Sequence, residues 1–142
     1  MPWKKKNDPL FRGDAATGVA LPDPAADLSI VEHILYLGGA GRPSRYQSTT
    51  EAEEIAGHFA GSAGKVYRTM ASRAEANGVR HLGNVELKAL LRGKGYGGAK
   101  GSNALLVMQA RRFAEQWAEH LFDFTDVPAA VVDSVVKDIY EP

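Results

Sequence analysis

Three consecutive hydroxyl residues, Ser48, Thr49 and Thr50, form a cluster that a plain β-strand would not require. They follow a strand-like run and precede Glu51, where a helical pattern begins. Ser and Thr are favoured at this position because their side-chain oxygen accepts a hydrogen bond from a free backbone N–H of the helix. The same hydroxyls could also line a cleft at the end of the strand, and the sequence leaves both interpretations open.

Two other polar side chains occur in apolar surroundings upstream of this cluster. Arg12 ends the short apolar run Leu10-Phe11, where a guanidinium is either solvated or placed for a role. His33 lies between apolar neighbours on an expected helix. A lone histidine in such a place is most often a structural, hydrogen-bonded residue. Neither side chain defines a site by itself.

The remaining chemical patterns are weak. Residues 93–98 match the letters of Gly-x-Gly-x-x-Gly, but the preceding strand and the βαβ context of a dinucleotide-binding loop are missing. The four histidines have neither His-x-x-x-His nor His-Glu-x-x-His spacing, and the chain contains no cysteine. The sequence also lacks a Gly-x-Ser-x-Gly nucleophile motif. No metal site is therefore expected.

Composition limits the general partners of the protein. Seventeen basic residues balance seventeen acidic ones, which gives no electrostatic argument for nucleic acid or an anionic membrane. No apolar run approaches the ~20 residues of a membrane span, and Lys4–Lys6 are not followed by the apolar segment of a signal peptide. The absence of cysteine fits a reducing compartment, and it equally fits a protein that crosses membranes unfolded.

The pattern of apolar residues predicts a single mixed α+β domain over residues 10–142, after a polar tail at residues 1–9. Helices are expected at residues 28–36, 51–60 and 103–117, and strands at 10–14, 45–49, 65–70, 121–124 and 131–140. Residues 85–91 fit either a strand or a short helix, and the glycine-rich residues 93–101 are expected to form a mobile loop.

Taken in chain order, these motifs resemble the Arg-Ser-Glu class of mono-ADP-ribosyltransferase toxins, the cholera and pertussis type. Phe11-Arg12-Gly13-Asp14 is similar to their Tyr-Arg-x-Asp opening, and Ile30–Ile34 with His33 is similar to the short helix that follows. Tyr46-Gln47-Ser48-Thr49-Thr50 resembles their strand ending in Ser-Thr-Ser, and Lys65-Val66-Tyr67 falls where their next strand carries Tyr-x-Tyr. Glu119, eight residues before Val127-Pro128, resembles their catalytic glutamate.

The resemblance implies an ADP-ribosyltransferase-like fold, a split pair of small antiparallel sheets with flanking helices around an NAD cleft. It implies NAD as the substrate, without a metal, and catalytic roles for Glu119, Ser48 and Arg12. Glu119 would bind the ribose 2′-hydroxyl and stabilise the developing positive charge. Ser48 would support Glu119, and Arg12 would hold a phosphate of NAD. The implied NAD-binding residues are Arg12, Gly13, His33, Ser48, Thr49 and Thr50, with His33 contacting the ribose or ordering Arg12.

One position departs from the family pattern. Members that modify arginine usually carry Glu or Gln two residues before the catalytic glutamate, where this chain has Trp117. Either Glu115 is the catalytic residue, or the acceptor is not arginine in the usual way. We favour Glu119 because its distance from Val127-Pro128 is nearer the family pattern.

The resemblance further implies a toxin domain of a larger secreted bacterial effector, delivered by a specialised secretion system and active in the cytoplasm of the target cell. Its partners would be a macromolecular acceptor, protein rather than RNA, and a cognate immunity protein, with no membrane involved. Two alternatives remain: an RNase-type toxin that uses His33 or His120, and a non-enzymatic partner-binding module such as an immunity or adaptor protein. Within the first interpretation, Thr50 is expected to cap the helix at Glu51 while Ser48 faces the ligand.

Overall fold

A computed structural model describes residues 8–26, 30–34, 44–90 and 104–141. Its strands are β1 (Leu10–Ala15), β2 (Tyr46–Thr50), β3 (Gly64–Thr69), β4 (Arg80–Leu82) and β5 (Glu119–Asp123). Its helices are α1 (Ile30–Ile34), α2 (Glu53–Ala60), α3 (Ala71–Ala76), α4 (Asn84–Leu90), α5 (Ala104–Gln116) and α6 (Val132–Ile139), with a 3₁₀ turn at Ala129–Val131 before α6.

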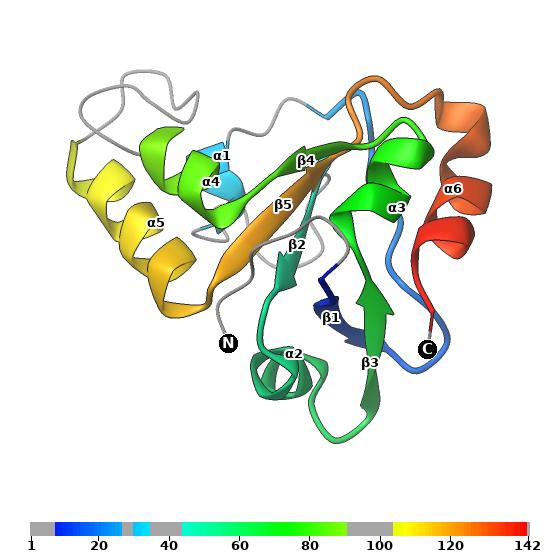
Figure 1. The fold of residues 1–142 in the computed structure, drawn as a ribbon, viewed down its shortest axis with the longest axis horizontal. Coiled ribbons are helices and arrows are strands. Elements are labelled where there is room, and N and C mark those ends of the chain that lie inside the picture. Colours follow the sequence, from blue (N-terminus) through cyan, green and yellow to red (C-terminus); the bar gives the residue numbers. More distant parts are fainter. Residues whose placement is uncertain (1–7, 27–29, 35–43, 91–103, 142) are drawn as a thin grey trace.

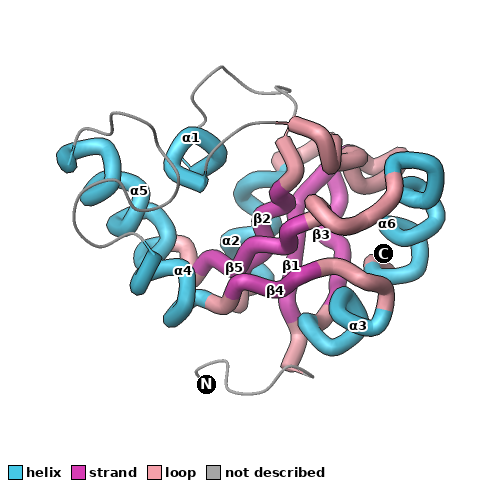
Figure 2. Tube along the Cα trace, turned by 90° about the horizontal axis from the view of Figure 1, so that it is seen from above, coloured by secondary structure: helices cyan, strands magenta, loops and turns pink. Residues whose placement is uncertain are grey.

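The strands form one open antiparallel sheet in the order β3-β1-β2-β5-β4, with helices on both of its faces (Figures 1 and 2). The α+β class is therefore confirmed. Helices α1, α4 and α5 cover one face through a core that includes Ile34, Leu87 and Leu121. Helices α3 and α6 cover the other face, where Phe122 and Ile139 belong to a second core. Strand β5 is buried on both sides because successive side chains enter opposite cores.

The sheet is weakest between β1 and β2. These strands pair only at Phe11 and Thr50, whereas β1 pairs with β3 along its full length and β2 pairs with β5 along its full length. The described residues thus form a single sheet, where a split pair of sheets was expected, but its two parts meet at one residue pair. Beyond that pair, Arg12 and Gly13 of β1 and Ser48 and Thr49 of β2 line a cavity.

Helix α2 packs closely on β1 at a glycine. A Cβ atom on Gly13 would lie 2.0 Å from the carbonyl oxygen of Ala56 and 2.5 Å from the backbone nitrogen of Ala60. No side chain fits in that space, so Gly13 lets the helix approach the strand. This contact sets one wall of the cavity between β1 and β2.

The expected strand at residues 131–140 is wrong, because most of this segment is α6. Its buried residues Val132, Val135, Val136 and Ile139 recur at helical spacing, and this periodicity outweighs the strand preference of a Val-rich segment. Residues 85–90 of the ambiguous segment lie in α4, and residue 91 lies outside the described residues.

The expected strands at 10–14 and 65–70 are confirmed as β1 and β3. Helix α5, at Ala104–Gln116, confirms the expected helix at 103–117. Strand β5 begins at Glu119, two residues earlier than expected. The glycine-rich loop at 93–101 and most of the N-terminal tail lie outside the described residues.

Candidate active site

A cavity of about 160 Å³ lies where β1 and β2 diverge. It receives side chains from three segments that are far apart in the sequence: β1, the end of β2, and the junction of α5 with β5. Helix α2 closes another side. The lining residues are Phe11, Arg12, Gly13, Ser48, Thr49, Thr50, Ala56, Phe59, Trp117 and Glu119.

Ser48 and Glu119 are in direct contact within this cavity. The register of β2 on β5 places Thr50 opposite Glu119 and Ser48 opposite Leu121, so Ser48 and Glu119 are diagonal neighbours on one face of the sheet. The Ser48 hydroxyl donates a hydrogen bond of 2.5 Å to Oε2 of Glu119. Two of the residues proposed from the sequence are therefore joined directly.

Arg12 reaches the same place from β1. Its Nη1 donates a hydrogen bond of 2.9 Å to the carbonyl oxygen of Ser48, and its Nε donates one of 3.0 Å to Oδ2 of Asp14. The Asp14 carboxylate also accepts from the backbone N–H groups of Ala15 and Ala20, so it is a fixed support for the guanidinium. Arg12 is held by Asp14 and Ser48, and its charge lies beside the carboxyl of Glu119.

His33 of α1 lies between two serine hydroxyls. Its Nδ1 lies 2.8 Å from the Ser44 hydroxyl, and its Nε2 lies 2.8 Å from the Ser48 hydroxyl. It therefore orders Ser48, whereas the ordering of Arg12 falls to Asp14. The edge of its ring also meets Tyr46, with ring centroids 5.7 Å apart.

Glu119 is a buried carboxyl, with 4% of its surface exposed. Loss of water around the carboxyl raises its pKa to about 7, although the Ser48 hydrogen bond and the charge of Arg12 both act to lower it. Its second oxygen, Oε1, is buried and accepts no hydrogen bond from the described part of the chain. A buried acceptor without a donor is costly, and it is suited to a hydroxyl group brought by a ligand.

The two threonines have distinct roles in the fold. Thr49 donates to the carbonyl oxygen of His120, and its side chain is buried. Thr50 donates to the carbonyl oxygen of Trp117 at 2.6 Å and accepts from the backbone N–H of Ala52 at 3.2 Å. The expected cap of a helix at Glu51 is wrong, since α2 starts at Glu53 with Ala52 as its N-cap residue. Thr50 instead ties the end of β2 to the junction before β5.

Glu115, the alternative catalytic residue, is exposed on α5, whereas Glu119 lines the cavity. The sequence motifs did not indicate that the aromatic side chains of Phe59 and Trp117 belong to the site. The Trp117 ring stacks on Phe113 with centroids 4.8 Å apart and meets the ring of Phe59 edge-on at 5.1 Å. Trp117 lies in the turn between the end of α5 and the start of β5, so no local helix or strand pattern directs it to the site.

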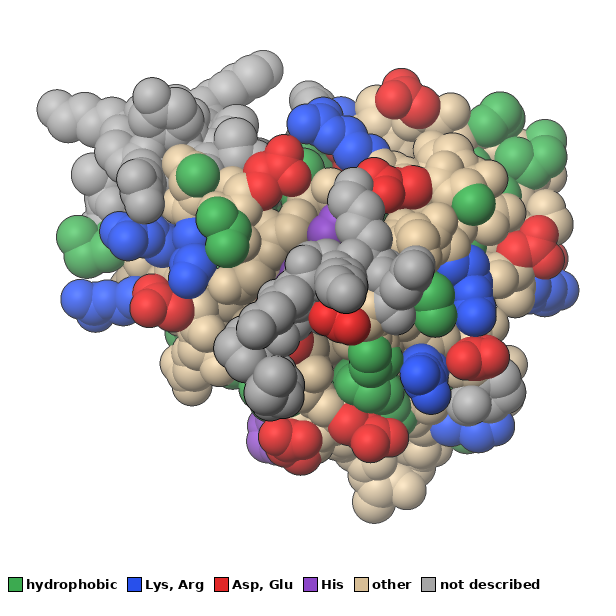
Figure 3. Space-filling model, in the orientation of Figure 1, with side chains coloured by type: hydrophobic (Ala, Val, Ile, Leu, Met, Phe, Trp, Pro, Cys, Tyr) green, Lys and Arg blue, Asp and Glu red, His purple; other side chains and the backbone are tan. Residues whose placement is uncertain are grey.

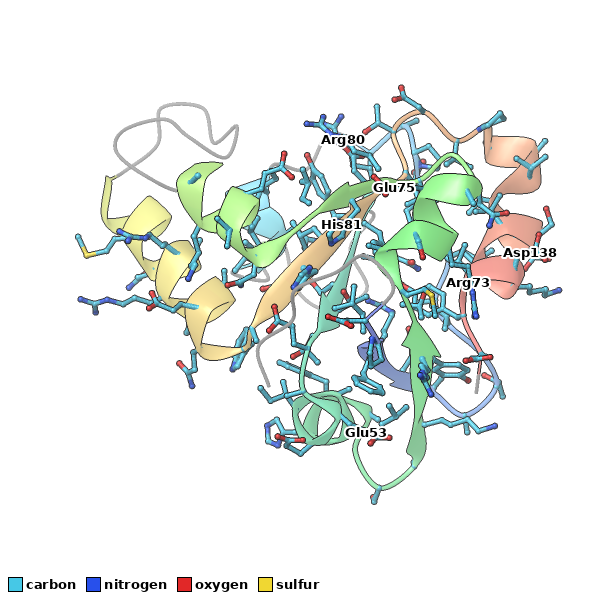
Figure 4. The ribbon with its side chains drawn as sticks, in the orientation of Figure 1. Glu53, Arg73, Glu75, Arg80, His81 and Asp138 are labelled. Atoms are coloured by element: carbon cyan, nitrogen blue, oxygen red, sulfur yellow. The ribbon has the colours of Figure 1, made fainter. Side chains whose placement is uncertain are left out.

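A second polar cluster lies on the opposite face of β5. Nε2 of His81 is 2.8 Å from Nδ1 of His120, and Nε2 of His120 is 2.6 Å from a carboxylate oxygen of Glu51. His81 projects from β4 and is labelled in Figure 4. His120 is fully buried, and its desolvation lowers its pKa. Burial favours the neutral imidazole of His120, whereas the hydrogen bond to Glu51 and the charge of Glu51 act in the opposite direction.

Within the described residues, no group of three or more His, Cys, Asp or Glu side chains is arranged to hold a metal ion. No described helix is long and apolar enough to cross a membrane. Comparison of the chain with protein-family models, with curated proteins and with solved structures found no match. The assignment of a function to the cavity therefore rests on its residues and their geometry.

Proposed function

We propose that this chain is a mono-ADP-ribosyltransferase that breaks the nicotinamide–ribose bond of NAD and transfers ADP-ribose to a macromolecule. One observation carries the proposal. Arg12, Ser48 and Glu119, proposed from three distant segments, line one cavity and are linked by hydrogen bonds of 2.9 Å and 2.5 Å through Ser48. A single bound ligand can be served by all three only if they converge in this way.

The chemistry of the reaction matches the groups in the cavity. Breaking the bond leaves positive charge on the ribose ring, and a fixed carboxylate beside that ring lowers the energy of the charged state. Oε1 of Glu119 supplies an acceptor for a ribose hydroxyl. Arg12, already oriented by Asp14, suits a phosphate of NAD because a guanidinium donates in a planar fork. Phe59 and Trp117 offer ring surfaces for the flat nicotinamide.

The architecture supports the same proposal. The sheet is nearly divided between β1 and β2, and the cavity lies at that division. This is the arrangement expected of an ADP-ribosyltransferase-like fold, in which two small sheets border an NAD cleft. The cavity of about 160 Å³ is too small for a whole dinucleotide, so the rest of NAD would extend along the diverging strands.

The biological setting follows from the resemblance. We propose a toxin domain that acts in the cytoplasm of a recipient cell, modifies a macromolecule there, and is neutralised by a cognate immunity protein. The experiment for this part is expression in a bacterial cytoplasm, where the wild-type chain is expected to arrest growth. Growth arrest that persists unchanged in the Glu119→Gln variant would refute a toxicity based on this cavity.

The biochemical test incubates the purified chain with NAD and a cell lysate. Release of nicotinamide and labelling of a macromolecule with ADP-ribose are expected from the wild-type protein. Glu119→Gln should abolish both, and the matched variant Glu115→Gln, on the exposed face of α5, should retain both. Absence of NAD turnover in the wild-type protein would refute the proposed reaction.

The two alternatives are less well supported. An RNase would need an accessible histidine and a basic surface, but His120 is fully buried and His33 is only 9% exposed. Acidic and basic side chains are interspersed on the face shown in Figure 3, as the zero net charge suggests. A purely structural partner-binding module would have no reason to bring Glu119 and Arg12 together around a shared cavity.

A further inference from the structure

A continuous line of four polar side chains leads away from the cavity. It runs from Glu119 Oε2 to the Ser48 hydroxyl, then to the two ring nitrogens of His33, and ends at the Ser44 hydroxyl. The three links measure 2.5, 2.8 and 2.8 Å. His33 and Ser44 are each 9% exposed, so most of this line is sheltered from water.

The positions of the protons along this line depend on one another. A hydroxyl has a single proton, so when Ser48 donates to Glu119, Nε2 of His33 must donate to Ser48. When Glu119 carries the proton, the order reverses: Glu119 donates to Ser48, Ser48 donates to Nε2, and Nδ1 of His33 donates to Ser44. When Nδ1 keeps its proton in both orders, the same heavy-atom geometry accommodates both, and they differ only in whether His33 or Glu119 holds the shared proton.

We propose that Glu119 and His33 share one proton through the Ser48 hydroxyl, and that His33 takes this proton when the ribosyl cation forms. This inference rests on the proposed function. In the step, the proton on Glu119 Oε2 passes to Ser48 Oγ, and the original Ser48 proton passes to His33 Nε2. Ser48 is unchanged, Glu119 becomes a carboxylate, and His33 becomes an imidazolium that donates to Ser44.

The proposed reaction requires this proton transfer. A carboxyl whose burial favours the neutral form cannot stabilise a cation until it loses its proton. Because the Glu119 and His33 side chains are both buried, His33 offers an acceptor that the proton reaches without leaving the fold. The pyridinium of NAD leaves as neutral nicotinamide, and the acceptor releases its own O–H or N–H proton to solvent as its bond to the ribose forms. The shared proton then returns from His33 to Glu119 along the same path. His33 is therefore a positioning residue that acts through Ser48 and does not contact NAD.

The groups around Glu119 and His33 favour movement of the proton between these two side chains. Arg12 from β1 lies beside Glu119 and favours its carboxylate form. Tyr46 from β2 meets the His33 ring edge-on, and its burial raises the pKa of its own hydroxyl, which therefore stays neutral. Helix α5 packs against α1 with the apolar Ala110 and Ala114. The Ser44 hydroxyl also accepts the backbone N–H of Tyr46, which fixes its orientation toward His33.

The first test compares pH profiles of nicotinamide release for the wild-type protein and His33→Gln. Glutamine keeps an N–H that can donate to Ser48 but cannot accept a proton at neutral pH. The variant must lose the Glu119 proton to solvent, so its rate should fall about tenfold for each pH unit below the Glu119 pKa, while the wild-type rate changes little just below that point. Above pH 8 the two rates should converge, and Ser48→Ala should show the same shift.

Parallel wild-type and His33→Gln profiles would overturn the shared proton, because a purely structural role lowers the rate equally at every pH. The second test needs no NAD: the His33 ring is titrated by NMR in the wild-type protein and in Glu119→Gln. Loss of the carboxyl should move the His33 titration to lower pH, and an unchanged titration would overturn the proposal. This NMR result decides the shared proton separately from the proposed function, which fails only if the wild-type protein does not consume NAD.

Discussion

The hydroxyl of Ser48 donates a 2.5 Å hydrogen bond to the carboxyl of Glu119, although the two residues are 71 positions apart in the chain. Neither strand alone creates this contact. It depends on the antiparallel register of β2 and β5, which sets Ser48 and Glu119 on one face of the sheet. The cavity is thus assembled by strand pairing, and its chemistry depends on keeping that pairing intact.

The buried carboxyl should make the protein less stable as pH rises. Since the pKa of Glu119 in the folded protein is about 7, above the 4.5 of an ordinary glutamate, the folded state binds more protons than the unfolded chain between these values. The free energy of unfolding should therefore fall as pH rises from about 4.5 to about 7 and then level off. Glu119→Gln removes this loss and should be more stable than the wild-type protein at pH 8, by an amount on the order of 3 kcal/mol.

Urea denaturation of both proteins at pH 5 and pH 8 measures this effect. The stability difference between Glu119→Gln and wild type should be clearly larger at pH 8 than at pH 5. The exposed Glu115→Gln is the control for the loss of one carboxyl from the same region. An equal difference at both pH values would mean that Glu119 is not perturbed by burial.

Arg12 should contribute to NAD binding through the shape of its side chain as well as its charge. Arg12→Lys keeps the positive charge but loses the planar fork that contacts Asp14 and Ser48 together. We expect the KM for NAD to rise by about tenfold or more, as for the loss of a charge-assisted hydrogen bond. The control is Arg68→Lys. Arg68 is exposed and lies on β3, which pairs with β1 on the side away from β2. An unchanged KM in Arg12→Lys would remove Arg12 from the NAD site.

Local sequence patterns predicted much of the fold but not the contacts of the site. The apolar spacing of α2 and α5 and the runs of β1 and β3 are local signals, and they were sufficient for those elements. The α6 segment was misread because valines favour strands by local preference, while their helical spacing matters only once a core exists to receive them. Long-range pairing determines the rest.

The candidate site was predicted in part for the same reason. The order of motifs along the chain indicated Arg12, Ser48 and Glu119, but nothing local specifies that β1 and β2 pair at one residue only. Ser44 lies just before β2, outside any motif of the sequence. Its contact with His33 depends on how α1 packs over the sheet.

Gly13 should be required for the packing of α2 and the shape of the cavity. An alanine Cβ at this position would lie 2.0 Å from the Ala56 carbonyl oxygen, so the helix must move away from β1. Gly13→Ala is expected to cost about 1–3 kcal/mol of stability, as overpacking commonly does, and to impair NAD turnover through the displaced wall. The matched control is Gly57→Ala on α2 itself, where the nearest atom is 4.0 Å from the added Cβ.

Gly57→Ala should stabilise the protein by about 0.5–1 kcal/mol, because alanine is favoured over glycine within a helix. Thermal denaturation of the two variants beside the wild-type protein measures both effects. If Gly13→Ala were as stable as the wild type, the close approach of α2 to β1 would not be a constraint on the fold.

The buried imidazole of His120 should oppose the effect of Glu119 at low pH. Desolvation lowers the pKa of His120 in the folded protein below its usual 6.5. Between the lowered pKa and 6.5, the unfolded chain therefore binds more protons than the folded protein. Stability contributed by neutral His120 is therefore present above pH 6.5 and is lost as the pH falls below it. Replacing the side chain by His120→Phe should flatten this part of the stability profile, although the loss of the bonds to His81 and Glu51 should lower stability at every pH.

The quantity that decides this prediction is the slope of the unfolding free energy between pH 6.5 and pH 5, because the slope does not depend on the constant cost of the substitution. Measuring it in a Glu119→Gln background removes the opposing slope of the carboxyl. His58→Gln, a substitution at an exposed histidine on α2, controls for the removal of one histidine from the chain. If His120→Phe kept the full parental slope, the low-pH loss of stability would have to arise from another group, and the buried His81–His120–Glu51 cluster would have no part in it.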